Sequence, residues 1–379
     1  MTPYNGLPFF CILVIVLLPA AILGHFGKRL RLYGLLATML VLLAVFEGWT
    51  AKLLLLLFWA LQTALCFSYL AVRKRCEQRW MLWIFLLASL APLLLVKLAV
   101  FVPRLLFLAI LGVSYMTFRA VQVLIEIYDG HIKALNLLDF SYFLLFFPSV
   151  SSGPIDRYRR FSDDLAKPLE RDAYDRLALE GFWKLMTGAL YSFVVGNLIW
   201  QYWLEALPQS GFGATVGYMY GYTLFMFFNF AGYSRMAIGS AYLLGVKLPE
   251  NFNLPFLSRD MKDFWSRWHI SLSTWLRDYV YTRFCTQALR KKWFGGGRAS
   301  SYLGYFLTML LMGAWHGLTP AYLIYGAYHG VLMSLNEVLD TKWKRFRKLK
   351  KNNAVSILLI FITFHLFSFG LLIFSGRLL

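Results

Sequence analysis

Long runs of apolar residues recur along the whole chain and restrict the folds open to it more than any other feature. Residues 7–23, 53–72 and 354–374 are examples. A helix needs about 20 residues to cross the roughly 30 Å hydrocarbon core of a bilayer, and these runs approach or reach that length. The composition agrees, because 59% of the 379 residues are hydrophobic and 15% are charged, a balance that soluble domains rarely have. The sequence therefore predicts an integral membrane protein.

Ten runs are candidate membrane spans. Backbone polar groups in lipid must be satisfied within the segment, so each run predicts a helix. We expect an all-α bundle of about 10–11 transmembrane helices. No internal repeat or low-complexity linker is visible, which predicts a single membrane domain over residues 1–379. The spans are residues 7–23, 33–48, 53–72, 81–102, 105–127, 181–207, 218–246, 301–318, 321–339 and 354–374, and a shorter run lies at 137–150.

The Lys and Arg residues gather in alternate loops, which predicts the orientation of the chain. Cytoplasmic loops of membrane proteins carry an excess of these residues. With the N-terminus outside, most of them face the cytoplasm, so a plasma-membrane protein with both termini extracellular is expected. The net charge of +19 then matches an anionic inner leaflet, and nucleic acid is not an expected partner. The loops concerned are 28–32, 73–79, 127–133, 154–176, 247–299 and 341–353, with the run 342–351 as a topology anchor.

The short run at 137–150 has basic loops on both sides, so it should enter and leave on the same face of the membrane. Its continuation FFPSVSSGP, residues 146–154, contains helix-breaking and small residues. We interpret this stretch as the tip or exit of a re-entrant segment. A plain interfacial helix is the alternative.

Cysteine and metal chemistry receive no support from the sequence. The four cysteines show no pairing pattern and no CxxC motif, and no zinc-type arrangement is present. We therefore expect no metal site and no cofactor bound by the chain itself.

Two histidines stand out as candidates for chemistry. His316 lies in MGAWHGL near the expected outer end of a span, among small residues that leave room for a substrate. An imidazole can accept a proton from a hydroxyl that attacks a carbonyl carbon. A hydrogen-bonded packing histidine is the alternative. His269 lies within residues 263–281, where the spacing of Trp265, Trp268, Leu272 and Trp275 predicts an interfacial helix. It is either a snorkelling interface residue or part of the wall of a polar pathway.

Polar residues inside an expected span mark a possible substrate channel. The segment FFNFAGYSRMAIG, residues 227–239, places a guanidinium in the membrane, which is costly unless it lines a cavity or meets a partner. Lys97, Arg119 and Lys184 raise the same question. The channel candidates are Asn229, Tyr233, Ser234, Arg235 and Trp315.

Several motifs, in order, resemble the membrane-bound O-acyltransferase family. They are SYMTFRAVQ, FPSVSSGPIDRYRRF, the run NFNLPFLSRDMKDFWSRWHISLSTWLRDYVY, and GAWHG. The motif-bearing region extends over about residues 114–330, and the N-terminal spans fit the family in number and spacing. Within the family, the chain resembles the members that serve teichoic-acid D-alanylation in Gram-positive bacteria. The resemblance implies a helical bundle with re-entrant and interfacial helices around a central channel.

The resemblance also implies roles for individual residues. His316 would be the catalytic residue at the floor of an outward-opening cavity, and His269 would lie on the cytoplasmic side of the same path. The donor would be a D-alanyl thioester on the phosphopantetheine arm of a small acidic carrier protein. The acyl group would pass to a hydroxyl on a partner membrane protein or peptide, and onward to lipoteichoic acid. Asn229 departs from relatives, which often have an acidic residue there, so a negative charge at this position is absent.

The basic run that follows the long motif is the expected contact for the acidic carrier or the phosphate of its arm. Apolar side chains just before it would add contact area. The candidates are Val280, Tyr281, Phe284, Arg290, Lys291, Lys292 and Arg298.

Two other functions remain open from the residues. An acyltransferase that acetylates an extracellular polysaccharide would share His316 and the fold, although the SSGPIDRYRRF run favours D-alanyl transfer. A transporter would explain charged residues within spans, but the chain lacks paired discontinuous helices and repeat symmetry.

Overall fold

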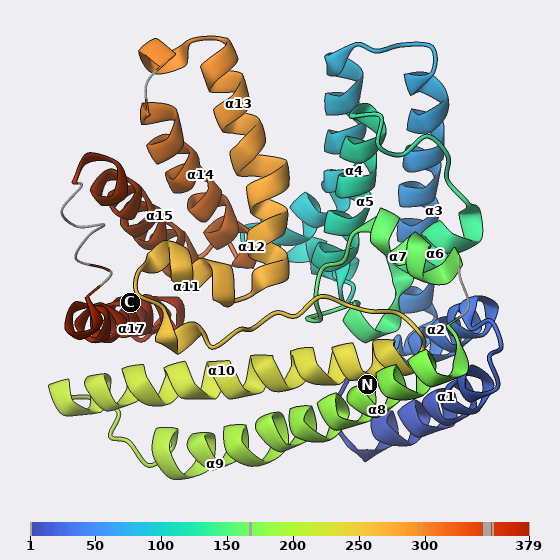
Figure 1. Ribbon diagram of the computed structural model, residues 1–379, viewed down its shortest axis with the longest axis horizontal. Coiled ribbons are helices and arrows are strands. Elements are labelled where there is room, and N and C mark those ends of the chain that lie inside the picture. The colour runs from blue at the N-terminus through green and yellow to red at the C-terminus, as the bar shows by residue number, and fades with distance from the viewer. Residues whose placement is uncertain (1, 167–168, 297, 344–349, 351, 379) are drawn as a thin grey trace. The chain divides into compact units, whose positions relative to one another are not determined.

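The computed structural model describes residues 2–166, 169–296, 298–343, 350 and 352–378 (Figure 1). These residues are mostly helical, and the only β pairing among them is an isolated antiparallel bridge between Phe252 and Trp268. The expected all-α fold is confirmed. Most of the expected anchor at 342–351 lies outside the described residues.

The chain groups into two compact units, and their boundaries alternate along the sequence. Unit 1 comprises Met1–Leu190 and Gly232–Pro249, and unit 2 comprises Tyr191–Ala231 and Glu250–Leu379. One long helix, α10 (Phe212–Leu243), contributes to both units. The single-domain expectation stays a prediction.

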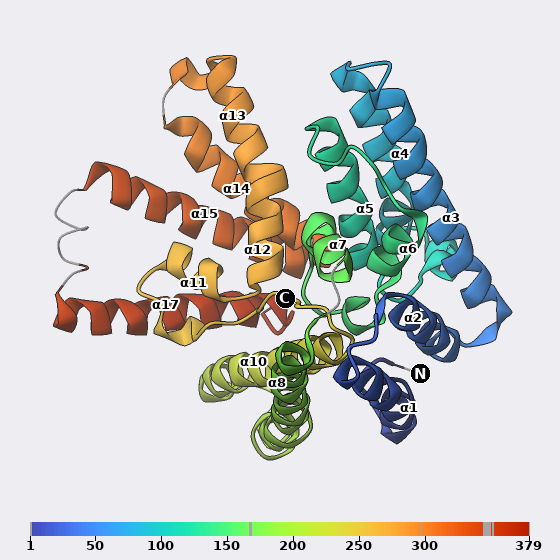
Figure 2. The same cartoon turned by 45° about the vertical axis from the view of Figure 1, so that its right-hand side comes forward.

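Unit 1 contains the N-terminal helices. In both views α3, α4 and α5 lie side by side (Figures 1 and 2). Its elements are α1 (Leu7–His25), α2 (Arg31–Val45), α3 (Gly48–Arg73), α4 (Arg79–Leu98), the 3₁₀ helix η1 (Pro103–Leu108), α5 (Val113–Tyr128), α6 (Leu137–Leu145), the 3₁₀ helix η2 (Phe147–Ser149), α7 (Tyr158–Ala166) and α8 (Arg171–Ala189).

Unit 2 contains the motif-bearing C-terminal part. Its elements after α8 are the π-helix η3 (Leu190–Gly196), α9 (Asn197–Ile199), the π-helix η4 (Trp200–Leu204), the 3₁₀ helix η5 (Pro255–Leu257), α11 (Met261–Arg267), α12 (Ile270–Leu276), the π-helix η6 (Arg277–Tyr281), α13 (Thr282–Arg290), the 3₁₀ helix η7 (Trp293–Gly296), α14 (Ala299–His316), α15 (Pro320–Lys342) and α17 (Asn353–Phe374).

Five described helices are long and apolar enough to cross a membrane, so the protein is a multi-pass membrane protein. They are Leu7–His25, Gly48–Arg73, Arg79–Leu98, Arg171–Leu204 and Asn353–Phe374. Arg31–Val45 and Leu137–Ser149 are shorter apolar helices. The expected spans at 218–246, 301–318 and 321–339 coincide with α10, α14 and α15.

The expected continuous span at 105–127 is wrong in its first part. The chain forms the short helix Pro103–Leu108 and then breaks, and α5 begins only at Val113. Gly112 causes the break because it has φ 77°. A Cβ at this position would lie 2.2 Å from the carbonyl oxygen of Val150, so the turn needs a glycine for space as well as for its backbone angle.

The segment at 137–150 runs into the interior of unit 1. Asn136 caps α6 by accepting hydrogen bonds from two backbone N–H groups, and every residue from 141 to 150 is buried. An interfacial helix would leave one face exposed along its length. The burial argues against a plain interfacial helix, and the re-entrant interpretation stays a prediction.

A buried arginine holds the end of this segment. Arg119 is 1% exposed, and its guanidinium donates to the carbonyl oxygens of Phe143, Leu144 and Ser149 and to the Ser149 hydroxyl. Carbonyls in the last turn of a helix have no partner within it, and here a guanidinium supplies the donors. This network answers the question that Arg119 raised within an apolar span.

Candidate active site

The hairpin of α14 and α15 positions His316, which is the last residue of α14. The two helices approach closely because glycines face each other. A Cβ at Gly313 would lie 2.4 Å from the Tyr322 carbonyl oxygen, and one at Gly326 would lie 2.8 Å from the Met309 carbonyl oxygen. Small residues at such crossings let backbones meet in membrane proteins. The GAWHG motif thus provides both the histidine and the small residue that seats its helix.

His316 lies among aromatic rings and is half-buried. Its ring centroid is 4.6 Å from that of Trp315, 5.0 Å from that of Phe374 and 6.1 Å from that of Tyr322. The ring centroid of Tyr325 lies 6.3 Å from that of His316. The imidazole is therefore partly accessible and has aromatic neighbours.

His269 lies in the break between α11 and α12, and its backbone is left-handed with φ 45°. Hydrogen bonds from the two residues after His269 to Asn251 fix this conformation. Ile270 N–H donates to the Asn251 carbonyl, and Ser271 N–H donates to Asn251 Oδ1 at 3.2 Å. Non-glycine residues with positive φ are uncommon and cluster at functional sites, and histidine is among those that tolerate it.

The two histidines come together through a tryptophan that lies between them. The ring of His269 is 6.4 Å from that of Trp315, which in turn contacts His316. On its other side His269 contacts Phe230, with ring centroids 4.7 Å apart. His269 is 5% exposed, and its Nδ1 has no hydrogen-bond partner among the described residues. Two motifs far apart in sequence therefore build one site in unit 2.

The prediction of an interfacial helix over residues 263–281 is wrong. The helix is interrupted at Trp268 and His269, and the aromatic stripe is not at a surface. Trp265, Trp268, Leu272 and Trp275 are each 5% exposed or less. Their three- and four-residue spacing reflects packing into the core of unit 2, where Phe264 and Phe367 contact Trp268.

The channel candidates divide between the two units. In unit 1, Tyr233 shares a hydrogen bond with Ser151, Ser234 is buried, and Arg235 Nε donates to Thr187 Oγ1 at 2.9 Å. Arg235 thus has a hydroxyl partner.

In unit 2, Asn229 is exposed and its Oδ1 accepts a hydrogen bond from Ser192 at 3.0 Å. Trp315 belongs to the histidine cluster. Of the channel candidates, only Trp315 therefore has a ring contact with a candidate catalytic histidine.

The carrier candidates extend from the end of η6 through α13 to the start of α14. Arg290, Lys291 and Lys292 are exposed and have no ion-pair partner within the described ranges. Arg298 is exposed too, and its Nη1 donates to the Thr341 carbonyl at 3.2 Å.

The apolar candidates beside this run are more enclosed. Val280 and Phe284 are partly exposed, whereas Tyr281 stacks on Tyr305 and bonds to Ser301. Exposed apolar side chains that the sequence did not single out adjoin the basic run: Leu289, Trp293 and Phe294.

An ion-pair network that the sequence did not reveal holds α11 against α15. Lys262 Nζ contacts Glu337 and Asp340, and Lys350 Nζ lies 2.6 Å from Asp260 and 2.7 Å from Asp340. Burial lowers the pKa of Lys262, but its hydrogen bonds to Glu337 and Asp340 outweigh this and raise the pKa above its ordinary value. The network fixes the helix that leads into His269.

Comparison with known proteins identifies the class to which this fold and site belong. The model of the membrane-bound O-acyltransferase family matches residues 43–376. The chain belongs to the membrane-bound O-acyltransferase family.

Individual members of known function class are also similar to the chain. The chain is 43% identical over 390 residues to the teichoic acid D-alanyltransferase of Bacillus subtilis (strain 168), covering 100% of this chain and 98% of the relative. It is 37% identical to the teichoic acid D-alanyltransferase of Streptococcus thermophilus, covering 99% and 95%. A probable alginate O-acetylase of Pseudomonas syringae is 32% identical over 70% of this chain and 50% of that relative.

Proposed function

We propose that this membrane acyltransferase transfers D-alanine toward teichoic acid. The observation that carries the proposal is the full-length match at 43% identity to a teichoic acid D-alanyltransferase. The match to a probable alginate O-acetylase is shorter, at 70% of this chain, and supports acetyl transfer to a polysaccharide only as the second candidate.

The donor in this proposal is a D-alanyl thioester on the phosphopantetheine arm of an acidic carrier protein. A thioester is already activated, so the enzyme needs to position two reactants and manage one proton. The hydroxyl oxygen of the acceptor attacks the thioester carbonyl carbon, and the carbon–sulfur bond breaks. The hydroxyl proton passes to His316 and then to the departing thiolate. The half-buried position of His316 among aromatic rings supports this role.

His269 is the second residue of the proposed site and lines the path of the donor arm. Its support is the shared contact with Trp315 and a ring nitrogen without a partner in the described part of the chain. A buried polar atom of this kind is costly unless a ligand or water meets it. The acyl group then reaches a hydroxyl acceptor on a membrane partner and finally lipoteichoic acid.

The orientation that suits this chemistry places the basic loops in the cytoplasm and both termini outside. The carrier then approaches from the cytoplasm and meets the exposed cations Arg290, Lys291 and Lys292. Long-range attraction between opposite charges accelerates such encounters. Neighbouring exposed Trp293 and Phe294 add apolar contact area.

A reconstituted transfer assay tests the function. Proteoliposomes receive carrier loaded with labelled D-alanine, or an acetyl donor, together with an acceptor. We expect D-alanyl transfer that is lost in His316→Ala but retained in His365→Ala, a partly buried intramembrane histidine outside the cluster whose Nδ1 contacts the Phe361 carbonyl oxygen. Preferential acetyl transfer would favour the polysaccharide alternative. Full activity of His316→Ala with intact insertion would refute the proposed mechanism and leave a transporter open.

Charge reversal tests the carrier surface. Lys291→Glu/Lys292→Glu should weaken carrier binding and raise its salt sensitivity, while Lys74→Glu/Arg75→Glu, in another exposed basic loop, should not. Binding is measured by the change in carrier affinity with ionic strength. Unchanged affinity in the first variant would remove this surface from the proposal.

A further inference from the structure

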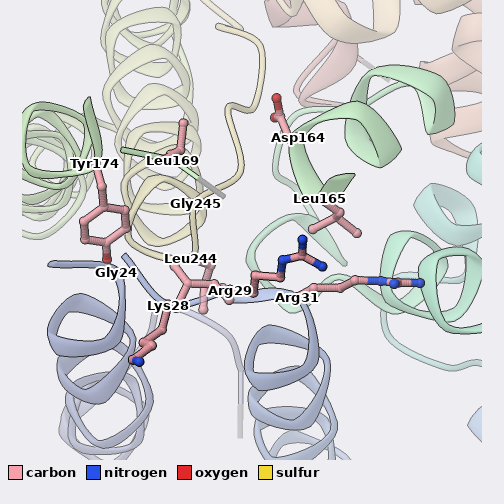
Figure 3. A pocket seen from close by; sticks show the side chains of 11 residues that line it. Gly24, Lys28, Arg29, Arg31, Asp164, Leu165, Leu169, Tyr174, Leu244 and Gly245 are labelled. Carbon is pink, nitrogen blue, oxygen red and sulfur yellow. The ribbon is translucent and has the colours of Figure 1, made fainter. Parts of the chain in front are cut away.

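A pocket in unit 1 contains none of the residues of the histidine cluster and has no role in the proposed transfer. It forms where the α1–α2 loop meets α7, the start of α8 and the end of α10 (Figure 3). Its lining includes three cations from the loop and the start of α2, one acidic residue, and the leucines Leu30, Leu165, Leu169 and Leu244. The combination of cationic and apolar lining is suited to an amphiphilic anion.

The walls of the pocket are built by specific contacts. The Tyr174 hydroxyl contacts the carbonyl oxygens of Ala20 at 3.1 Å and Leu243 at 2.8 Å, which ties α8 to α1 and to the end of α10. Gly24 makes room for this ring, because a Cβ there would lie 2.1 Å from Tyr174 Cζ. These contacts fix the part of the pocket wall that Tyr174 forms.

Two of the charged residues that line it are already paired. Arg31 donates to Asp139 at 2.5 Å and to Asn136 at 2.9 Å. Asp164 accepts hydrogen bonds from Arg160 at 3.0 Å and from the Lys247 backbone N–H at 2.8 Å. These contacts neutralise the single acidic side chain at the pocket and one of its three cations.

The other two cations are available. Lys28 and Arg29 are exposed, and neither side chain has a hydrogen-bond or ion-pair partner in the described part of the chain. In Figure 3 the guanidinium of Arg29 extends toward α7, where Leu165 lies, while Lys28 extends away from the centre. An unpaired guanidinium in a leucine-lined pocket matches the fork of donors that binds phosphate oxygens.

The location of the loop indicates the source of that phosphate. The loop follows α1, a helix apolar enough to span a membrane, and is flanked by the exposed side chains of Ile22, Phe26 and Leu32. Apolar surface that gives way to unpaired cations marks the headgroup level of a bilayer, where basic pockets between helices bind anionic lipid headgroups. We infer that this pocket binds the phosphodiester of an anionic glycerophospholipid, with Arg29 as the main cation and Lys28 as the second.

Lipid retention by the full chain tests the inference. The protein is exchanged into micelles containing phosphatidylglycerol or phosphatidylcholine, and bound lipid is counted by native mass spectrometry. At about 1 kcal/mol per cation near the surface, Arg29→Gln should lower phosphatidylglycerol affinity about fivefold and Lys28→Gln/Arg29→Gln about 25-fold. The control Lys74→Gln/Arg75→Gln removes the same charge from a loop outside the pocket and should retain wild-type affinity. Arg29→Lys keeps the charge but lacks the fork of donors, so it should bind phosphatidylglycerol more tightly than Arg29→Gln and more weakly than the wild type.

Four results would overturn the inference. Equal retention of phosphatidylcholine would remove the requirement for an anionic lipid. An equal loss of phosphatidylglycerol affinity in the control Lys74→Gln/Arg75→Gln would show that net charge alone explains the effect. Displacement of the lipid by millimolar inorganic phosphate would assign the pocket to a soluble phosphate. Loss of carrier binding without loss of lipid would assign the cations to the protein partner. Since the double variant removes two topology-determining charges, Arg29→Gln alone decides the matter if the double variant fails to insert.

Discussion

Substituting Gly313 by alanine is the sharpest perturbation of the proposed active site that leaves its chemistry intact. Gly313 precedes His316 by less than one helical turn and touches the backbone of α15. The added Cβ would lie 2.4 Å from the Tyr322 carbonyl oxygen, and ordinary contact begins at 3.4 Å, so the two backbones must separate by about 1.0 Å at this point. Backbone atoms cannot rotate aside as a side chain can.

Gly313→Ala should lower the rate of transfer more than it lowers the stability of the protein. Overpacking costs about 1–3 kcal/mol, while replacing a helical glycine by alanine returns up to about 1 kcal/mol, so the protein should still fold. A 1 Å misplacement of a catalytic group can lower a rate about 100-fold. We therefore expect a loss of D-alanyl transfer of about 100-fold in Gly313→Ala. Gly326→Ala, whose Cβ would lie 2.8 Å from a carbonyl oxygen, requires about 0.6 Å and should lose less.

The assay compares kcat for transfer with the melting temperature of the same purified samples. Gly213→Ala is the matched control, because it makes the same substitution in the first turn of α10 with nothing within 4 Å of the new Cβ. The expected order of loss is Gly313→Ala, then Gly326→Ala, then no loss in Gly213→Ala. Wild-type transfer in Gly313→Ala, or a drop fully explained by unfolding, would contradict the geometric argument.

Two further substitutions probe the supports of His269. Asn251→Ala removes the side-chain oxygen that accepts a hydrogen bond from Ser271 N–H, so the rate of transfer should fall and about 1–3 kcal/mol of stability should be lost. Asn251→Asp keeps that oxygen, so the transfer assay should show most of the wild-type rate and the thermal melt most of the wild-type stability. Lys262→Met leaves the carboxylates of Glu337 and Asp340 without this cation and should lower the melting temperature through a loss of about 1–2 kcal/mol, whereas Lys262→Arg should not; an unchanged melt in the methionine variant would show that the network is unimportant.

The sequence by itself determined the class of fold and singled out His316 as the candidate catalytic histidine, whose role stays a prediction. Apolar runs of span length force helices, because lipid offers no partner to an open backbone. This argument placed helices at α1, α3, α4 and α17 without reference to any contact. The short motif around His316 likewise stood out, because a polar side chain among small residues near the end of a span is unusual enough to be noticed locally.

The tertiary structure alone decided which residues surround that histidine. The spacing of Trp265, Trp268 and Trp275 is the same whether they face a membrane interface or a protein core, and only packing distinguished the two. The break at His269 depends on hydrogen bonds from a segment near Asn251, about 20 residues earlier, and periodicity carries no information on such pairing. Similarly, the sequence alone interprets an arginine in a loop as a topology signal. For Arg29, only the fold showed that an unpaired charge lies beside a leucine-lined pocket. Local patterns fix helices because their hydrogen bonds are local, whereas sites are formed by contacts between distant segments.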